Sequence, residues 1–564
     1  MVALIFVGGC VFMGLAYVFY GRFLERELEV DDAKETPAHT LYDNMDYVPT
    51  ATPILFGHHF SSIAGAGPIV GPVIAGLAFG WGPALLWILL GSVFIGGVHD
   101  FTSLIASIRH RGRSIGQLCK DLLNPFAYYL FLIFIWFTLM YVLIVFLDLT
   151  ALSFAPVPVA AGPASDAIML QARQGGAVAT ASIFYIVLAI LFGLSIYKLK
   201  VHISVATVVF VSLVFAGLWF GNRFPLSAQN IPPFLGSVKN TWNLVLIVYC
   251  FGASILPVWI LLQPRDYLSS FLLYSSLLGG AVGLVVSGFM GKVAINYPAF
   301  ITVNDPQLGF IFPTLFVTVA CGAVSGFHSI VASGTTAKQL DRESSALKVG
   351  YGSMLVEGCL ALLALAAVMM LTRKSSDQPV AVFAQGLAQF LSVFGLKSSI
   401  AVTFGMLAVS TFLLTTLDTC TRLCRFIFEE LFNLRGPLAR YLGTFAALLV
   451  PSIMVFREIP GPGGRLMPAW KAIWPAFGAA NQLLAALALL VVYAWLKRSG
   501  RKAWYVLIPM VFMCATTITA LSQLVIQNLL GRGSLLIGAV SLVLDLLAIA
   551  LVIDTYLHVR RRRA

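Results

Sequence analysis

The sequence predicts an all-α polytopic membrane protein with about fifteen transmembrane helices, and three observations lead to that prediction. Of its 564 residues 59% are hydrophobic and only 11% are charged, and the mean hydropathy is +0.91. Soluble domains carry about 25% charged residues. The apolar residues form segments of about 20, which is the length that a helix needs to cross the hydrocarbon core. The net charge of +12 comes from short basic clusters between these segments, as the positive-inside rule requires, so a nucleic-acid partner is not indicated.

The length criterion places the spans in order along the chain. The first segment has no basic start and no small-residue cleavage site, so we expect a retained span and not a signal peptide. Residues 380–394 are apolar but short, and we expect them to be re-entrant or interfacial. The predicted spans lie near residues 2–20, 53–80, 83–108, 126–150, 177–197, 201–221, 241–262, 267–290, 309–336, 348–372, 400–428, 438–456, 472–496, 503–527 and 535–557.

The basic clusters orient these spans. They fall on one side if the N-terminus is outside, the C-terminus is inside and the loop 21–52 is cytoplasmic. The chain then divides into a first span with its loop (1–52), a main region with two broken helices (53–372), a short re-entrant or interfacial segment (373–396) and a C-terminal transmembrane bundle (397–564). The clusters are Arg109–Lys120, Lys198–Lys200, Arg265, Lys338–Lys348, Arg422–Arg435, Lys497–Lys502 and Arg560–Arg563.

Two spans contain polar, glycine-rich interruptions, His58–Pro68 and Gly326–Thr336. Aligned without gaps, they share Phe, Ser, Ile and Gly at corresponding positions, and the charge pattern places them in opposite directions. Lipid cannot satisfy free backbone groups, so an unwound segment survives only beside protein or a water-filled cavity. Such breaks expose helix ends that bind ions and substrates. The alternative is a pair of tight helix crossings, because small residues also let helices approach closely.

A third polar element runs from Ser410 to Arg422 with hydroxyls and charges at helical spacing. We expect Asp418 and Arg422 to pair, since they are four residues apart. Thr415 and Thr416 either offer hydroxyl oxygens to an ion or substrate, or bond back to the preceding turn. Ionisable groups inside spans, such as Asp100 beside His99, are functional candidates by default. Glu357 and Asp545 belong to the same class, and the polar set Trp474–Gln482 either bridges helices or lines a pathway.

Motifs of soluble enzymes are absent from the sequence. It contains no Walker sequence, HExxH, GxSxG or paired CxxC, and its histidines and carboxylates do not cluster at metal-ligand spacing. We therefore expect no enzyme activity, no cofactor and no metal site. A membrane protein with two broken helices and no ATP motor is typical of a carrier that moves a small polar solute.

The chain closely resembles the carbon starvation protein A family of bacterial inner-membrane transporters over nearly its whole length. The resemblance implies a secondary transporter whose core is the two inverted five-helix repeats of the amino acid–polyamine–organocation (LeuT-like) superfamily. Family members are linked to uptake of pyruvate or of peptides when carbon is scarce. The matching segments are Leu41–Asp43, His58–Pro72, Gln263–Leu268, Gly350–Met354, Thr415–Arg422 and Trp474–Gln482.

By analogy with that superfamily, His58–Pro68 is the first broken core helix and Gly326–Thr336 is its inverted partner, with Thr415 and Thr416 as ion-site hydroxyls. A second register stays open. If the interrupted segment Phe251–Pro257 is the partner, Ser333, Thr335 and Thr336 become the ion-site hydroxyls instead.

The sequence thus predicts a cation-coupled symporter in the inner membrane, using protons in preference to sodium, for pyruvate or short peptides. Sodium coupling, a membrane nutrient sensor and a channel are the alternatives. Its partners would be the substrate, the cation and the bilayer, with no nucleic acid. For substrate binding we single out Ser61, Ser62, Gly65, Gly67, His328 and Ser329. For ion or proton coupling we single out His58, His59, Asp100, Ser333, Thr335, Thr336, Thr415, Thr416 and Asp418.

Overall fold

The computed structural model describes residues 1–43, 47–122, 125–155, 166–226, 231–257, 260–460, 466–530 and 534–561, and most of them are helical. The first half contains α1 (Val2–Ala16), η1 (Tyr17–Gly21), α2 (Arg22–Glu27), α3 (Pro37–Thr40), α4 (Thr52–Ile63), α5 (Gly67–Phe79), α6 (Trp81–Gly91), η2 (Ser92–Gly96), α7 (Gly97–Arg109), α8 (Ile115–Leu122), α9 (Pro125–Phe154), α10 (Asp166–Tyr197), α11 (Ile203–Arg223), α12 (Val238–Ile255) and α13 (Leu262–Phe289).

The second half continues this helical pattern and adds two short antiparallel strand pairs in the connections, β1 with β2 and β3 with β4. Its elements are β1 (Asn304–Asp305), β2 (Gly309–Phe310), α14 (Ile311–Thr318), α15 (Gly326–Gly334), η4 (Thr336–Lys338), η5 (Leu347–Gly352), α16 (Ser353–Met369), α17 (Pro379–Leu391), η6 (Ser392–Phe394), α18 (Ser398–Leu431), α19 (Pro437–Met454), β3 (Glu458–Pro460), β4 (Leu466–Pro468), α20 (Ala469–Arg498), α21 (Trp504–Val525), η8 (Ile526–Leu530) and α22 (Leu535–Arg561).

The helices confirm an all-α polytopic membrane protein. Within the described residues, twelve helices are long and apolar enough to cross a bilayer, and the bent pair α4–α5 makes a thirteenth. The other two predicted spans coincide with α12, which has 18 residues, and with the interrupted pair α14–α15. Residues 380–394 lie in a short apolar helix, Pro379–Phe394, that packs against α5, α13, α16 and α18.

The first predicted break is present. α4 ends at Ile63 and α5 begins at Gly67, and the two axes differ by 45°. Ala64 leaves helical geometry with φ −75° and ψ 67°. Pro68 stands in the first turn of α5, where its missing N–H costs no intrahelical hydrogen bond. The chain therefore restarts as a helix immediately after the unwound residues 64–66.

The second break lies a few residues before the predicted segment. Gly326–Gly334 is helical as α15, and the unwound residues are 319–325, between α14 and α15, so the expectation of an interruption within Gly326–Thr336 was wrong in position. Gly326 packs against the backbone of α20 at Asn481 and Ala485. Small residues of this kind permit close helix packing without breaking the helix.

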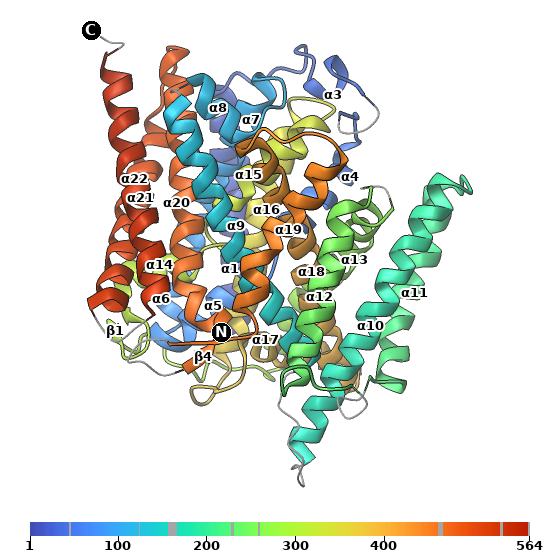
Figure 1. Cartoon of the computed structure of the whole chain (residues 1–564). Coiled ribbons are helices and arrows are strands. Elements are labelled where there is room, and N and C mark those ends of the chain that lie inside the picture. Colours follow the sequence, from blue (N-terminus) through green and yellow to red (C-terminus); the bar gives the residue numbers. More distant parts are fainter. Residues whose placement is uncertain are drawn as a thin grey trace.

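The two breaks touch each other. Gly67 faces the side chain of Cys321, and Gly71 faces the backbone at Thr318 and Val319. In Figure 1, α4 and α15 lie toward one end of the bundle while α5 and α14 lie toward the other, so the two broken helices run in opposite directions. The inverted arrangement therefore pairs the break at 64–66 with the break at 319–325.

The alternative partner, Phe251–Pro257, is not an interruption within one span. α12 ends at Ile255, Leu256 is extended, and α13 starts a separate helix at Leu262. α12 packs against α9, α18 and α19, whereas α13 packs against α4, α17 and α18, so the two are separate helices and not two halves of one. Because residues Phe251 to Ile255 continue α12, the interruption predicted there is wrong in position, and the choice of ion-site hydroxyls under either register stays a prediction.

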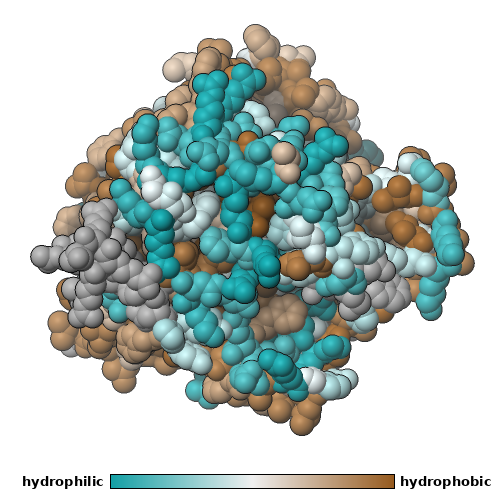
Figure 2. All heavy atoms as spheres, turned by 90° about the horizontal axis from the view of Figure 1, so that it is seen from above, coloured by the Kyte–Doolittle hydropathy of each residue, from teal (hydrophilic) through white to brown (hydrophobic). Residues whose placement is uncertain are grey.

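The ends of the bundle agree with the charge-based orientation. α3, α8 and the C-terminus lie at one end, and the N-terminus lies at the other (Figure 1). Seen from the end that holds α3, hydrophilic residues gather across the face and hydrophobic residues surround it (Figure 2). The positive-inside rule predicts that this hydrophilic face is the cytoplasmic one.

A polar strap crosses that face. We use this name for residues 28–43 and 47–52, which bond to residues 339–345 after the second broken helix. The backbone N–H of Asp31 donates to Glu343 Oε2 over 2.8 Å, Thr36 donates to the Leu340 carbonyl over 2.5 Å, and the Thr50 N–H donates to the Gln339 carbonyl over 3.0 Å. Arg109 at the end of α7 also pairs with Glu343 at 2.5 Å. The strap thus joins the end of α15 to the end of α7.

Candidate functional site

The first break lies against α18, as the sequence predicted for an ion site. Gly65 packs so closely on α18 that a Cβ there would stand 2.8 Å from Thr416 Oγ1 and 3.1 Å from the Phe146 ring. Glycine is required at this position because of that close approach. Of the two predicted threonines, Thr416 is the one that reaches the break.

The predicted hydroxyl groups bond mainly to their own helices. Thr415 and Thr416 donate to the Phe412 carbonyl at 2.8 and 3.0 Å, which is the back-bonded alternative from the sequence. Their oxygen lone pairs remain available to a cation. Ser333 donates to the Ser329 carbonyl and accepts from the Ile115 N–H of α8 at 3.0 Å, and Thr335 donates to Val331. Those two lie beyond the second break and do not join Thr416 at the first.

The structure brings together four of the six residues predicted for substrate binding. Ser61 and Ser62 stand in the last turn of α4 and donate to the His58 carbonyl at 3.2 and 2.8 Å. Gly65 lies in the break and Gly67 begins α5, so all four frame the first unwound segment. Ser329 is in the first turn of α15 and donates to the Gly326 carbonyl at 2.7 Å. All the side chains of these serines are buried.

His328 belongs to a different group, a fully buried charge network between α7, α15 and α16. His328 Nδ1 lies 2.7 Å from Asp100 Oδ2, and His99 Nδ1 lies 2.7 Å from Asp100 Oδ1. On the other side of the ring, His328 Nε2 lies 3.3 Å from Glu357 Oε2. All four side chains are completely buried. We call these residues the proton network.

His328 and Glu357 in this network can share one proton. His328 donates its Nδ1 proton to Asp100, so a neutral ring presents an Nε2 lone pair to the Glu357 carboxylate. His328 Nε2 and both Glu357 oxygens lack a hydrogen-bond partner, and 3.3 Å is a loose contact. A buried unpaired carboxylate is costly. One proton between His328 and Glu357 removes that cost, either as an imidazolium or as a protonated carboxyl group.

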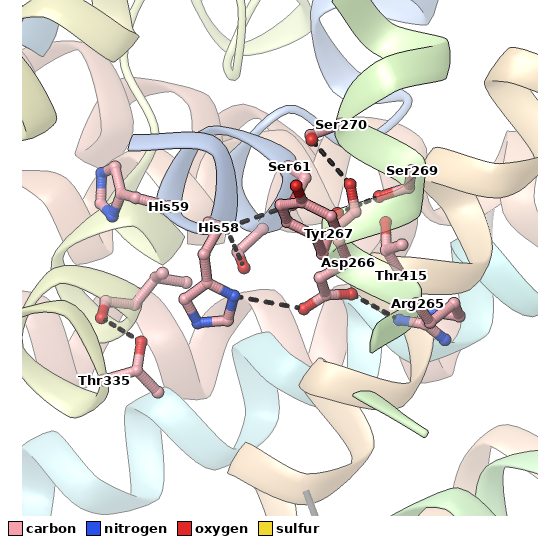
Figure 3. Close-up of polar contacts among 12 residues, drawn as sticks. His58, His59, Ser61, Arg265, Asp266, Tyr267, Ser269, Ser270, Thr335 and Thr415 are labelled. Atoms are coloured by element: carbon pink, nitrogen blue, oxygen red, sulfur yellow. Dashed lines mark hydrogen bonds and ion pairs between the residues drawn. The ribbon is translucent and has the colours of Figure 1, made fainter. Parts of the chain in front are cut away.

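The adjacent histidines of α4 face two different groups. His59 is buried and its Nδ1 lies 2.8 Å from Thr336 Oγ1, on the side of the proton network. The His58 side chain is 22% exposed, and its Nδ1 lies 3.7 Å from Asp266 Oδ2 of α13. Figure 3 shows the His58 ring turned toward Asp266 and away from His59. α4 therefore contacts both groups at once.

The predicted Asp418–Arg422 pair is wrong, and Asp418 belongs to the second of these groups. Asp418 instead accepts two hydrogen bonds from Arg265 of α13, one of them over 2.7 Å, and accepts from the Tyr249 hydroxyl at 2.9 Å. Arg422 donates to the Leu256 carbonyl. Arg265, expected to mark a cytoplasmic loop, is fully buried and also bonds Asp266 at 3.0 Å. Arg265 lies inside α13, which begins three residues earlier, and its side chain points into the bundle toward Asp418.

The sequence analysis used Arg265 only as a marker of orientation and assigned no site role to Arg265, Asp266 or Tyr249. The available signal was an Arg-Asp pair at the start of an apolar span. The bridging alternative for Trp474–Gln482 is confirmed: Asn481 Oδ1 accepts from the Phe327 N–H at 3.0 Å, and Gln482 donates to the Phe316 carbonyl. α20 thus holds the chain on both sides of the second break.

With this geometry described, known proteins can be compared. The family model for carbon starvation protein CstA matches residues 1–378 and 372–520. The chain belongs to the CstA family. Relatives include the peptide transporter CstA of Campylobacter jejuni, 33% identical over 90% of this chain and 78% of that protein. The Escherichia coli K12 peptide transporter CstA is 32% identical over 91% and 79%, and the pyruvate/proton symporter BtsT of the same organism is 29% identical over 90% and 79%.

Among solved structures, a mutant of the Eremococcus coleocola manganese transporter aligns over 92% of this CstA-family chain and 99% of its own, at 14% identity and a TM-score of 0.43. That likeness is too distant to bear on the site. With twelve or more apolar helices, this CstA-family member is a multi-pass membrane protein of the inner membrane, since the bacterial outer membrane holds β-barrels.

Proposed function

We propose that this CstA-family protein is a proton symporter that imports a small carboxylate such as pyruvate, or short peptides. The observation that carries the proposal is the buried proton network of His99, Asp100, His328 and Glu357, which has a place for one proton between His328 and Glu357. The names of its relatives, peptide transporter and pyruvate/proton symporter, support the same conclusion.

The coupling step follows from the position of the network. His328 is carried by α15, half of a broken helix, while Asp100 and Glu357 are carried by α7 and α16. A movement of α15 changes the distance between the imidazole and both carboxylates. Two unit charges about 4 Å apart interact by about 4 kcal/mol at an effective dielectric constant of 20. A shift of the helix by a few ångströms therefore changes the free energy of proton binding enough to load and release one proton.

The proposed substrate site lies at the first break. The 13-residue α5 begins at Gly67, and a helix N-terminus favours a carboxylate. Pro68 has no N–H and the Ile69 N–H bonds the Ala66 carbonyl, so this terminus would offer the Gly67 N–H. Ser61 and Ser62 provide hydroxyls at the end of α4, and Ser329 provides one in α15. Pyruvate and the C-terminus of a peptide share the carboxylate that this site would hold. His328, predicted for substrate binding, acts in the proposal as the proton-binding group instead.

The test compares driving forces in proteoliposomes. Uptake of labelled pyruvate and dialanine should reach accumulation with an imposed pH gradient in sodium-free buffer, and a sodium gradient at constant pH should add little. Glu357→Gln and His328→Gln should abolish accumulation but retain exchange of substrate at equal concentration on both sides. Asp545→Asn is the matched control, because Asp545 of the peripheral α22 is also a buried carboxylate but accepts its hydrogen bond from Ser522 of α21.

Sodium coupling remains the second candidate, and one observation favours it: Thr416 lies against the break at Gly65. Hydroxyl and carbonyl oxygens suit a hard cation. Accumulation that appears only with a sodium gradient, and that disappears in Thr416→Val, would overturn proton coupling and select this site.

A further inference from the structure

A large apolar cavity lies on the side of the bundle, away from the site described above. Its volume is about 620 Å³, and its walls come from α1, α4, η5 and α16. Gly14, Tyr17, Phe56 and Leu355 are among the residues that line it, and Lys348 is the one charged residue in the lining that the structure describes. We call this space the α1 cavity.

The α1 cavity adjoins the lipid-facing surface of α1. Gly14 on its wall is exposed, as are the neighbouring large apolar side chains Val11, Leu15 and Val18. Protein interiors are packed to a density of about 0.75, and an apolar space of this size at the bilayer is filled by the surrounding solvent, which here is hydrocarbon. Water gains no hydrogen bonds in such a lining.

The charge at the rim of the cavity indicates which lipid headgroup would bind there. Lys348 is exposed in η5, at the end of the bundle that carries the basic clusters. Arg22 and Lys348 both act electrostatically on Glu25, so a second cation stands near the same rim, and Asp32 of the strap, which also acts on Glu25, accepts a hydrogen bond from Ser344. No carboxylate lines the described cavity, and Glu25, the carboxylate that interacts with Lys348, also interacts with Arg22, so a phosphate at Lys348 meets two cations and one carboxylate outside the lining.

We propose that the α1 cavity binds one acyl chain of an anionic phospholipid from the cytoplasmic leaflet, with its headgroup phosphate at Lys348. The site is separate from the proposed transport site but shares α4 with it. Thr52, Pro53 and Phe56 form a wall of the cavity, and His58 is two residues further along the same helix. A bound chain therefore supports the first turns of the broken helix.

Two variants test the site: one fills the cavity and the other removes the positive charge. A Cβ at Gly14 meets no atom within 4 Å, so Gly14→Phe places a ring in the cavity without a clash. Gly8 has the same free space but does not line the cavity, so Gly8→Phe is its matched control. Lys348→Gln removes the charge, and Lys198→Gln changes another exposed lysine of a predicted cytoplasmic loop.

The measurement is native mass spectrometry of the intact protein after detergent extraction and exchange into an equal mixture of phosphatidylglycerol and phosphatidylcholine. We expect wild type and Gly8→Phe to retain one phospholipid per chain, with phosphatidylglycerol preferred about fivefold, the factor that one lysine near the headgroup supplies. Gly14→Phe should lose the lipid, and Lys348→Gln should keep it without the preference.

Retention of the lipid by Gly14→Phe at the wild-type level, or its absence from wild type, would overturn the proposal. An equal headgroup preference in Lys348→Gln and Lys198→Gln would overturn the assignment of Lys348. Each variant is first checked as a monodisperse peak, so that loss of lipid is not confused with loss of fold. None of these outcomes depends on transport.

Discussion

Removing one partner of the Arg265–Asp418 pair should destabilise the protein strongly. Breaking a buried ion pair in this way costs about 3–5 kcal/mol, because a charge remains without compensation. In Asp418→Asn, Arg265 keeps Asp266 at 3.0 Å and the Tyr249 hydroxyl at 2.7 Å, so we expect the lower value, about 3 kcal/mol. In Arg265→Gln, two buried carboxylates lose their cation, and the cost should approach about 5 kcal/mol.

The double variant Arg265→Gln with Asp418→Asn separates charge from packing. It leaves one carboxylate, Asp266, in place of two, so it should be more stable than Arg265→Gln alone. The assay is reversible unfolding in mixed micelles, where a loss of about 3 kcal/mol lowers the folding equilibrium constant roughly a hundredfold. A double variant less stable than Arg265→Gln would refute the charge argument.

Arg422→Gln is the control for this pair. The residue lies four positions after Asp418 and bonds the Leu256 carbonyl. Its loss should cost about 1 kcal/mol, as for one hydrogen bond. If Arg422→Gln matched Asp418→Asn and Arg265→Gln had no effect, the local pairing would be correct and the long-range pairing wrong.

Three further outcomes are expected. Single cysteines at Ala33 and Ala564 should resist an impermeant thiol reagent in intact cells, and strong labelling of either would invert the orientation. Gly67→Ala brings a Cβ against Cys321 at the crossing of the breaks and should cost about 1–3 kcal/mol in a thermal melt, against no measurable change in Gly8→Ala. Asn481→Leu leaves the buried Phe327 N–H without its acceptor and should cost about 1–3 kcal/mol, which an unchanged melting temperature would contradict.

The spans and the first break could be predicted because their causes are local. About 20 apolar residues cross a bilayer whatever their neighbours are, and Gly65-Ala66-Gly67-Pro68 interrupts a helix through its own backbone chemistry. The second break was misplaced because its cause is not local. The glycine at 326 serves packing on α20, while the unwound residues 319–325 are held by Asn481, which is more than 150 residues away in the sequence.

The pairing of the charged groups could not be predicted for the same reason, because it depends on residues far apart in the sequence. Asp418 and Arg422 have ideal spacing for a helical pair, yet Asp418 instead bonds the buried guanidinium of Arg265 from α13. The sequence identified His328, Asp100 and Glu357 as ionisable groups in spans, but only the packing of α7, α15 and α16 brings His328 to 2.7 Å from Asp100 and to 3.3 Å from Glu357. Roles for Ser61, Ser62 and the threonines stay predictions, since hydroxyls bonded to their own helix are compatible with both a structural and a binding role.

The strap has a mechanical consequence. Because the strap is bonded to residues 339–345, and Glu343 is bonded to Arg109, the segment that follows α15 is tied both to the strap and to the end of α7. A tilt of α15 that keeps these bonds therefore carries the strap and the end of α7 with it.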